Sequence, residues 1–474
     1  MKSVFAALVL ILAAGGCAAA APAAITPLAA PRAQPAVRAL VQRDGDRWTV
    51  DYRFDRDAPA WGFVDSALER RTRQPWRARQ WTVETPGVEL VRIGARDLLR
   101  SRDGSPVPRQ VRIAFRPQAV DLEAAYATLA FSDGAVALPS GQFDAFPVYD
   151  LDAPAVMNSD LNGLDLGVDA AEVTWRDAAG PVLFKGQRRA SVTASDARTY
   201  VLFGQADLRL GQRLAMVMDP NLPSWIGDQI GRFGPRVIDY YAERLGDSGA
   251  GKPTVMVAWN GPTERMASMS GSALPGLIVM SFEGQGVTTP SAEMLERSRW
   301  FIGHESAHFW LGQKVRYARA SEAWITEGGA DLMAVRALQA QDPAYDARAE
   351  LQTEVDDCAR LTVGRGVESA GSRGEHRAYY ACGAVFALAA EAAQKRATGG
   401  DWFDFLRPLL DGRDVLTRQD WLAALGRVGA DRTLANDVSR LLDDGAADPS
   451  AVIARLFERT GVAFRFEGGR VVLM

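Results

Sequence analysis

The chain has 474 residues, of which 47% are hydrophobic and 24% are charged, and its formal net charge is −4. This composition is typical of a soluble globular protein that is long enough for two or three domains, each with its own core. The 54 lysines and arginines do not outnumber the 58 aspartates and glutamates, so the charge balance excludes the basic proteins that bind nucleic acid.

The first residues have the pattern of a targeting segment. A positively charged start precedes an apolar run from Val4 to Ala14, and the letters G-G-C follow, ending at Cys17. Small residues before a cysteine resemble a bacterial lipoprotein signal, which is cleaved before a cysteine that then carries lipid. Ordinary secretion with cleavage inside residues 18–21 is the alternative. We expect a signal peptide over residues 1–17 and a periplasmic protein of the bacterial cell envelope, anchored to the membrane through lipid on Cys17.

The next two segments differ sharply in composition. Residues 18–38 are rich in Ala and Pro without periodicity, so we expect an extended tether. Residues 39–212 have the pattern of strands: Arg47–Phe54 alternates with period two, and turn pairs such as Asp103-Gly104 separate similar stretches. Many short strands without intervening helices favour an N-terminal β-sandwich or saddle domain over 39–212.

The pattern changes after residue 212, and we expect a second, mostly helical domain over 213–400. Trp225–Leu245 has helical spacing, whereas Pro253–Trp259 and Gly276–Phe282 predict buried strands. Residues 401–474 are expected to form a short helical segment that ends in a small hairpin. No run after the N-terminal one is long and apolar enough to span a bilayer.

One predicted helix carries the residues on which the functional interpretation depends. Thr289 offers an N-cap with a proline after it, and the helix that follows should end near Gly312. It contains H-E-x-x-H at His304, Glu305 and His308. In a helix, the two histidines lie one turn apart on the same face, so both imidazoles can ligate one zinc ion.

A carboxylate from the next helix can complete the ligand set. Glu327 follows His308 after about eighteen residues, inside W-I-T-E-G-G-A. Three protein ligands leave the fourth position for water, which is the layout of a catalytic zinc, and we expect one zinc per chain. Glu305 lies about 100° round the helix and can act as general base toward that water. A surface helix with two incidental histidines is the alternative, but the chain has three histidines and two are here.

This pattern resembles the aminopeptidase N family of zinc metallopeptidases, gluzincins with a thermolysin-like catalytic domain. His308–Gly312 is similar to that family's H-Q-W-F-G, and Tyr380–Gly383 is similar to its Y-E-K-G. Phe146–Asp150 and Thr199–Phe203 are similar to segments of its N-terminal β domain. The resemblance implies an α+β multidomain hydrolase of peptide bonds, in which Tyr380 stabilises the transition state.

The chain departs from the family at one motif. Exopeptidases of the family carry G-A-M-E-N followed by W-G-L-I, where this chain has Gly271–Ile278. The glutamate that grips a free α-amine is missing, although Glu264 or Glu283 can substitute from nearby loops. Exopeptidase and endopeptidase activity therefore both stay open. A catalytically degenerate lipoprotein that binds zinc or peptides is the alternative, and the presence of Glu305 favours an active enzyme.

Further residues have two interpretations each. Asp331 follows Glu327 by four residues, so it either accepts the second ring N–H of a ligand histidine, as in thermolysin-like enzymes, or faces solvent. His376 lines the cleft or is an ordinary loop residue. Cys358 and Cys382 form an even pair in an oxidising compartment, which suits either a disulfide that braces the helices behind the site or two buried thiols.

Overall fold

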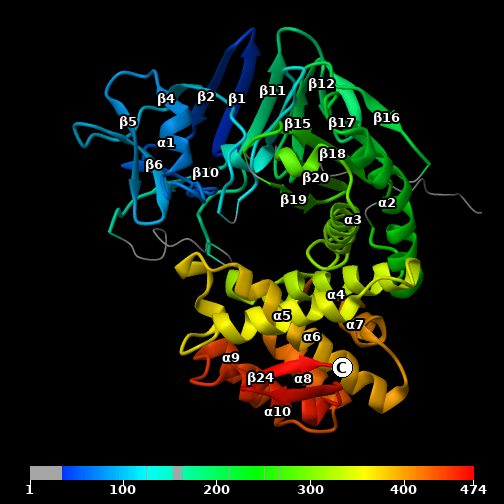
Figure 1. Ribbon diagram of the computed structural model, residues 1–474. Helices are drawn as coiled ribbons and strands as arrows, with labels where there is room; N and C mark the ends of the chain where they lie inside the picture. Colours follow the sequence, from blue (N-terminus) through cyan, green and yellow to red (C-terminus); the bar gives the residue numbers. More distant parts are fainter. Residues whose placement is uncertain are drawn as a thin grey trace, which may run out of the picture. The chain divides into compact units, whose positions relative to one another are not determined.

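The structure is a computed structural model that describes residues 35–123, 125–152, 161, 164–212, 214–249, 251–264 and 266–474 (Figure 1). The expected signal peptide, Cys17 and nearly all of the expected tether lie outside these residues. Residues 35–474 form one compact unit. Within the described residues, no helix has both the length and the apolar character needed to cross a membrane.

The N-terminal part is built from β-sheets, as the alternating pattern predicts. The predicted strand at Arg47–Phe54 is confirmed, and it pairs with its neighbour along its whole length, from Val37 opposite Phe54 to Asp44 opposite Arg47. In spatial order, the largest sheet contains β14 (Ser191–Ala194), β11 (Glu172–Asp177), β1 (Val37–Asp44), β2 (Arg47–Phe54), β7 (Gln110–Phe115) and β4 (Trp81–Val83).

Two smaller sheets accompany it in the described part of the chain. One contains β10 (Ala145–Val148), β3 (Ala60–Phe63), β6 (Arg96–Ser101) and β5 (Val88–Ile93). The other contains β13 (Gln187–Arg189), β12 (Val182–Phe184), β15 (Tyr200–Phe203), β9 (Val136–Pro139) and β8 (Leu129–Ala130). A short helix, α1 (Trp76–Gln80), precedes β4. Large aromatic side chains fill the core of this part, as where Phe54 stacks on Trp61 with ring centroids 4.0 Å apart.

A further sheet leads into the helical part. Its strands, in order, are β16 (Leu208–Leu210), β17 (Ala215–Met218), β18 (Thr254–Trp259), β20 (Leu277–Glu283) and β19 (Ser268–Leu274). β17, β18 and β20 run parallel and are mostly buried, which confirms the two strands predicted between residues 253 and 282. β19 is antiparallel to β20 and forms the edge of this sheet.

Helices make up most of the chain after residue 290, and Figure 1 shows them gathered below the sheets in that view. The helix predicted at Trp225–Leu245 is confirmed as α2, which lies before residue 290 in the chain. The bounds are α2 (Ser224–Leu245), α3 (Ala292–Ala307), α4 (Trp324–Gln341), α5 (Ala347–Leu361), α6 (Arg377–Thr398), α7 (Trp402–Leu410), α8 (Arg418–Val428), α9 (Leu434–Asp443) and α10 (Pro449–Thr460). The predicted terminal hairpin is confirmed as β23 (Phe464–Glu467) with β24 (Arg470–Leu473). The fold class is therefore α+β, with an N-terminal β part and a mostly helical C-terminal part.

The helix with the H-E-x-x-H pattern is shorter than predicted at both ends. Ser291 is the N-cap, because its side chain accepts a hydrogen bond from the Met294 N–H at 3.1 Å, so the expected cap at Thr289 is wrong. The helix ends at Ala307 instead of near Gly312. Beyond it, the backbone N–H groups of Phe309 and Trp310 donate to carbonyls three residues earlier, and the ring N–H of Trp310 donates to the Gly246 carbonyl at 2.9 Å.

Close packing of α4 against α6 depends on glycines that face each other. A Cβ added to Gly328 would lie 2.1 Å from the Gly383 carbonyl carbon, and a Cβ added to Gly383 would lie 2.1 Å from the Trp324 carbonyl oxygen. The two backbones therefore touch at this crossing, in the middle of a core of buried aliphatic and aromatic side chains.

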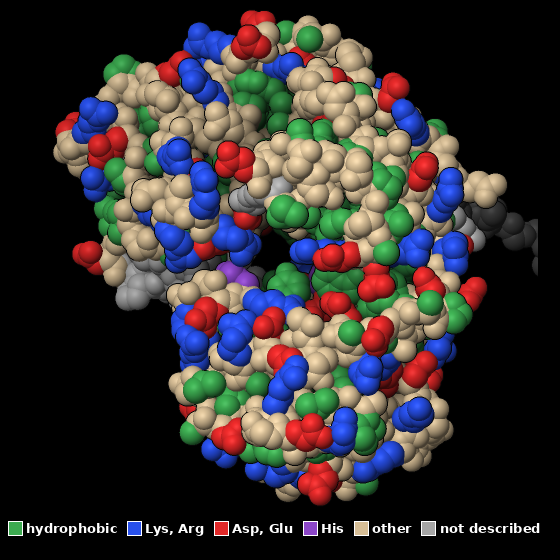
Figure 2. Space-filling model, in the orientation of Figure 1, with side chains coloured by type: hydrophobic (Ala, Val, Ile, Leu, Met, Phe, Trp, Pro, Cys, Tyr) green, Lys and Arg blue, Asp and Glu red, His purple; other side chains and the backbone are tan. Residues whose placement is uncertain are grey.

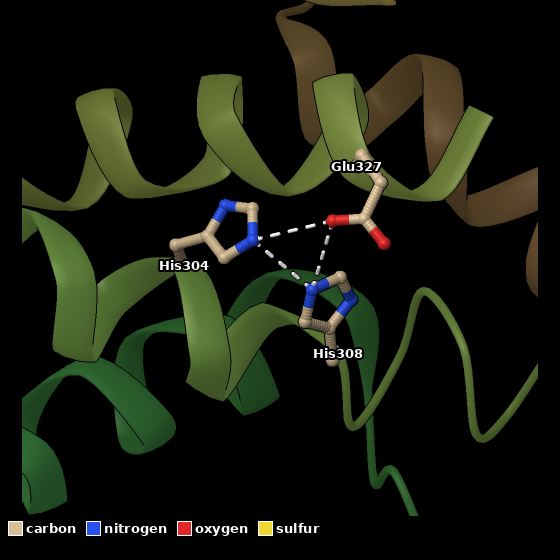
Figure 3. A group of neighbouring side chains, drawn as sticks. All are labelled: His304, His308 and Glu327. Carbon is tan, nitrogen blue, oxygen red and sulfur yellow. Dashed lines mark hydrogen bonds and ion pairs between the residues drawn. The ribbon is translucent and has the colours of Figure 1, made fainter. Parts of the chain in front are cut away.

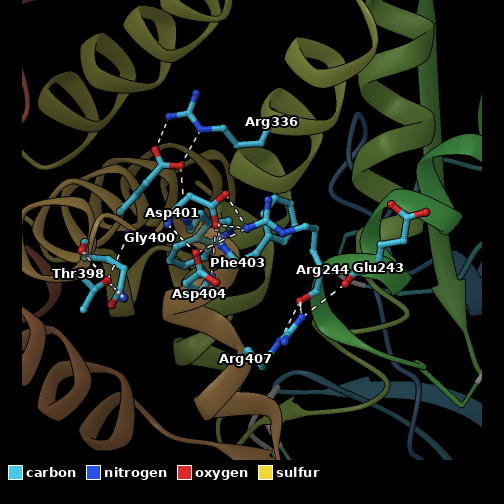
Figure 4. A network of polar contacts seen from close by, with 12 residues as sticks. Glu243, Arg244, Arg336, Thr398, Gly400, Asp401, Phe403, Asp404 and Arg407 are labelled. Atoms are coloured by element: carbon cyan, nitrogen blue, oxygen red, sulfur yellow. Dashed lines mark hydrogen bonds and ion pairs between the residues drawn. The ribbon is translucent and has the colours of Figure 1, made fainter.

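Charged pairs tie the helices together around this core. Arg244, at the end of α2, donates to both carboxylate oxygens of Asp401 at 2.7 Å, just before α7 (Figure 4). Arg336 on α4 donates through Nε to Glu391 on α6 at 2.7 Å. These half-buried pairs connect α2 to the start of α7 and α4 to α6, and pairs of this kind add little net stability.

The structure joins Cys358 and Cys382 as a disulfide, which settles the choice between a cross-link and two thiols in favour of the cross-link. The bond connects α5 to α6 and closes a loop of 24 residues behind the H-E-x-x-H helix. Both sulfurs belong to fully buried residues. The disulfide therefore holds α6 against its neighbour independently of side-chain packing.

Removing this cross-link should lower the free energy of unfolding substantially. For a loop of this length, the chain-entropy model predicts that the Cys358→Ala, Cys382→Ala double variant loses about 3 kcal/mol of unfolding free energy. Urea unfolding followed by circular dichroism measures the change. Cys17→Ala is the matched control and should leave the midpoint where it was; an equal shift in both proteins would contradict the expectation.

Candidate metal centre

Two histidines and a glutamate converge where α3 meets α4 (Figure 3). His304 lies in the last turn of α3, His308 is its C-cap with a helical backbone conformation, and Glu327 lies in the first turn of α4. The Nε2 atoms of His304 and His308 are 3.1 Å apart, and Glu327 Oε2 is 3.4 Å from each of them. Because the helix end keeps its φ and ψ helical through His308, the two rings remain one turn apart.

The donor atoms fit a tetrahedral zinc ion. Ligand atoms about 2.0–2.1 Å from a tetrahedral metal lie about 3.3 Å from one another, which is close to the 3.1–3.4 Å spacing of these three donors. Two imidazole nitrogens and one carboxylate oxygen are also a donor set that zinc prefers. The centre therefore offers three ligands and leaves a fourth direction open.

The second nitrogen of each ring is held by a hydrogen bond. His304 Nδ1 lies 2.7 Å from Asp331 Oδ1, which decides between the two interpretations of Asp331 in favour of contact with a ligand histidine. His308 Nδ1 donates to the Leu311 carbonyl at 2.8 Å. These contacts favour the tautomer in which Nδ1 carries the proton and Nε2 presents its lone pair to the centre. Asp331 is thus buried and does not face solvent.

Replacing Asp331 by asparagine should weaken zinc binding without removing a ligand. Loss of the charged acceptor lowers the basicity of His304, and outer partners of this kind are worth about 10- to 100-fold in metal affinity. Competition with a zinc-selective chelator measures the change. Asp342→Asn, at the C-cap of the same helix, is the control and should bind zinc like the parent protein; equal affinities for all three would contradict the role of Asp331.

Glu305 lies next to the ligands but is held apart from them. Its side chain is buried, and Oε2 has no hydrogen-bond partner among the described residues. The backbone of β19 passes directly over it, because a Cβ added to Gly271 would lie 2.6 Å from Oε1. A buried carboxylate oxygen without a partner beside an open coordination position is suited to accept a proton from water there.

Tyr380 is the tyrosine that faces the centre. Its ring stacks on His304, with centroids 5.7 Å apart, and the charge of Glu327, followed by burial, raises the pKa of its hydroxyl well above the ordinary value. The neighbouring Tyr379 points elsewhere, since its hydroxyl accepts a hydrogen bond from the Gly371 N–H at 3.0 Å. A neutral hydroxyl at Tyr380 can donate a hydrogen bond to an oxyanion that forms in the site.

The charges of the centre shift one another's pKa values. Burial opposes the charged form of both histidines, but Asp331 outweighs it and raises the pKa of His304 well above its ordinary value, and Glu327 likewise raises the pKa of His308. Burial alone would raise the pKa of Glu327, yet the two imidazoles lower it. Burial raises the pKa of Glu305. Protons and a metal ion therefore compete for the imidazole nitrogens.

Three residues that shape the centre were given no role in it from the sequence. Trp300 stacks on His304, with centroids 5.4 Å apart, and lies one turn earlier on the same helix. Leu311 contributes only its carbonyl oxygen, and Gly271 contributes only its lack of a side chain. Its position four residues before His304 could have indicated Trp300. Leu311 and Gly271 contribute through their backbone, which the identity of a side chain does not reveal.

The other candidate residues are not part of the three-donor group. Glu283 accepts a hydrogen bond from Thr263 at 2.8 Å, and Glu264 is exposed. His376 is the N-cap residue of α6, where burial and, next, the charge of Arg70 lower its pKa. The space-filling view has a hollow at its centre, with arginine or lysine side chains and histidine around it (Figure 2).

Comparison with known proteins yields structural likeness alone. No protein-family model matches the sequence, and no curated protein sequence matches it. An M1 zinc metallopeptidase from Deinococcus radiodurans, as a mutant bound to a Tyr-Ser-Ala substrate, matches 85% of this chain and 91% of its own, at 17% identity and a TM-score of 0.44. A second structure of an M1 zinc metallopeptidase from that organism matches 86% of this chain and 92% of its own, at 16% identity and a TM-score of 0.44. The structure of native yeast LTA4 hydrolase covers 86% of this chain and 67% of its own, at 12% identity and a TM-score of 0.51. Over most of its length, this chain therefore has a fold similar to that of yeast LTA4 hydrolase.

Proposed function

We propose that this protein is a zinc-dependent peptidase that hydrolyses peptide bonds. The observation that carries the proposal is the placement of three donor atoms at tetrahedral spacing beside the buried, unpartnered carboxylate of Glu305. The similarity in fold to yeast LTA4 hydrolase is consistent with it.

Each side chain of the site has a separate role in the proposed reaction. His304, His308 and Glu327 would hold one zinc ion, which lowers the pKa of a bound water and polarises a carbonyl. Glu305 would take a proton from the attacking water as its oxygen bonds to the peptide carbon, and would pass that proton to the leaving amine as the C–N bond breaks. Tyr380 would donate a hydrogen bond to the oxygen of the tetrahedral carbon.

Metal analysis and a substrate panel test this proposal together. We expect about one zinc per chain and hydrolysis that stops when a chelator removes the metal and returns when zinc is added. Aminoacyl substrates and internally quenched blocked peptides distinguish exopeptidase from endopeptidase action. Zinc at full occupancy without hydrolysis of any peptide would favour the second candidate, a degenerate protein that binds peptides; absence of zinc would reject both.

We also propose that the chain acts outside the cytoplasm, attached to the periplasmic face of the envelope through lipid on Cys17. The disulfide between α5 and α6 supports an oxidising compartment. Fractionation of cells that produce the parent protein and Cys17→Ala tests the anchor: the parent should follow the membranes and the variant the soluble periplasm. Identical partitioning of the two would reject lipid attachment at this residue.

A further inference from the structure

A cavity of about 550 Å³ lies between α2, the first half of α3 and the end of α4, and we call it the three-helix cavity. Figure 1 shows these three helices next to one another. The volume lies within the range of about 300–1,000 Å³ that is usual for small-molecule sites. None of the three zinc donors lines this cavity, and nothing in the proposed hydrolysis uses it.

The three-helix cavity is separate from the metal centre. Gln341, which lines it, follows Glu327 by fourteen residues on α4, so about 20 Å of helix separates the two. Arg299, which also lines it, precedes His304 by five residues on α3, about 140° round the helix axis. A ligand in this cavity would therefore not contact the three zinc donors.

Three buried polar atoms of residues that line the cavity have no hydrogen-bond partner among the described residues. They are the amide nitrogen and oxygen of Gln341 and the hydroxyl oxygen of Tyr345, whose side chain is 9% exposed. Burial, followed by the charge of Glu350, raises the pKa of the Tyr345 hydroxyl, so this group stays a neutral donor. Since buried polar groups in proteins are nearly always hydrogen-bonded, these atoms are suited to bind a ligand in the cavity.

Two arginines of the lining have donors to spare. Arg236 is exposed, and it has no hydrogen bond or ion pair within the described part of the chain. Arg299 donates through Nε to the Gln229 side chain at 3.0 Å, and its Nη1 lies 3.5 Å from Asp342. The other terminal nitrogen of Arg299 is therefore available. Guanidinium groups with free N–H donors favour a carboxylate or a phosphate as their partner.

Acidic side chains limit the charge that a ligand can bring. Asp342 and the exposed Glu296 also line the cavity. The third arginine, Arg232, lies 3.8 Å from Asp228 in an exposed pair, in which solvent screens both charges. Three arginines thus stand against two carboxylates in the lining, and this balance suits one negative charge better than the two of a phosphate.

The apolar wall of the cavity consists of Phe233 on α2, Leu295 on α3 and Leu338 on α4. Phe233 and Leu338 are almost completely buried. An inorganic anion would leave this wall without contact, whereas a hydrocarbon group in the cavity would remove apolar surface from water. The lining therefore suits an anion that carries an apolar group.

We propose that the three-helix cavity binds a small organic carboxylate, with one carboxyl group on a short apolar body. Arg236 and Arg299 would bind the carboxylate, with hydrogen bonds from Gln341 and Tyr345. The apolar body would lie against the apolar wall. The inference goes beyond the proposed function, because this site is separate from the metal centre and needs no metal.

Titration with hexanoate, measured by ligand-observed NMR on the purified chain, tests the proposal. Hexanamide has the same apolar body without the charge, and inorganic phosphate has charge without an apolar body. We expect hexanoate to bind at least about tenfold more tightly than either compound, because only hexanoate offers both a charged acceptor and an apolar group. Binding of hexanamide or of phosphate as tightly as hexanoate would overturn the proposal.

Removal of zinc separates this site from the metal centre, since a carboxylate can also ligate zinc. The affinity for hexanoate should be the same before and after treatment with a chelator. Binding that disappears with the zinc would place hexanoate on the metal and overturn the proposal, while the proposed hydrolysis would stand. A chain that binds hexanoate but cleaves no peptide would have the opposite meaning: the cavity would be confirmed and the hydrolysis rejected.

Two substitutions connect binding to the cavity. Arg236→Gln should weaken hexanoate binding about 10- to 100-fold, because it removes a charged donor, and Gln341→Leu should weaken it about 3- to 10-fold. Arg427→Gln, at an exposed arginine on α8, is the matched control and should bind like the parent protein. Thermal unfolding shows which variants retain the parent fold, and either cavity variant alone can decide the test. Parental affinity in a folded Arg236→Gln or Gln341→Leu protein would overturn the assignment.

Discussion

Glu305→Gln should abolish turnover and leave the zinc in place. The amide cannot accept the proton of the attacking water, and loss of a general base costs about 10²- to 10⁴-fold in rate. The carboxylate is not among the three donors, so metal content should stay at that of the parent protein. Measuring kcat on the best peptide substrate together with zinc content for each preparation separates the two effects.

The shape of the site makes this substitution informative. Glutamine has nearly the volume of glutamate, and β19 at Gly271 leaves no space for a larger side chain, so the amide should occupy the same position. Glu296→Gln, an exposed residue on the same helix, is the control and should keep its activity. Parental kcat in the Glu305→Gln protein would assign the proton transfer to another group.

Gly328→Ala and Gly383→Ala should each damage both stability and the metal centre. A methyl group at either position would lie 2.1 Å from backbone atoms of the facing helix, and α4 and α6 would have to separate. Overpacking of this kind costs about 3 kcal/mol or more when backbones must move. Glu327 precedes Gly328 directly, and Tyr380 lies one turn before Gly383, so zinc affinity and kcat should fall as well.

A helical glycine with free space around it provides the matched control. Gly231 on α2 has no heavy atom within 4 Å of an added Cβ. Gly231→Ala should therefore stabilise the protein by about 0.5–1 kcal/mol, because alanine loses less backbone entropy in a helix. Urea unfolding and zinc titration of the three variants give the comparison; parental stability in the Gly383→Ala protein would show that the two helices can move apart at little cost.

Regular patterns in the sequence predicted the parts of the fold that follow from burial. Arg47–Phe54 alternates because one face of β2 meets the core, and the helical spacing of Trp225–Leu245 reflects the buried side of α2. The ligand set could be anticipated for a similar reason. Four-residue spacing in a helix fixes the relative position of His304 and His308, so local geometry alone places two of the three donors.

The remainder depends on contacts between distant segments, which leave little trace in composition. The end of α3 at Ala307 is decided by the hydrogen bond of Trp310 to Gly246, some sixty residues earlier. The position of Gly271 over Glu305 follows from the pairing of β19 at the sheet edge. The three-helix cavity arises only when α2, α3 and α4 pack against one another.

The disulfide between Cys358 and Cys382 makes the final rigidity of the protein depend on the compartment in which it forms. Cys382 lies two residues after Tyr380 on α6, so the covalent link secures the segment that carries the Tyr380 hydroxyl beside the metal centre. Thiols stay reduced in the cytosol, so with the export that we propose the link would form only after the chain has left that compartment. Newly made chains would thus remain less rigid, and less active toward cellular peptides, until they have left the compartment of their synthesis. Production in a host should accordingly direct the chain to the periplasm.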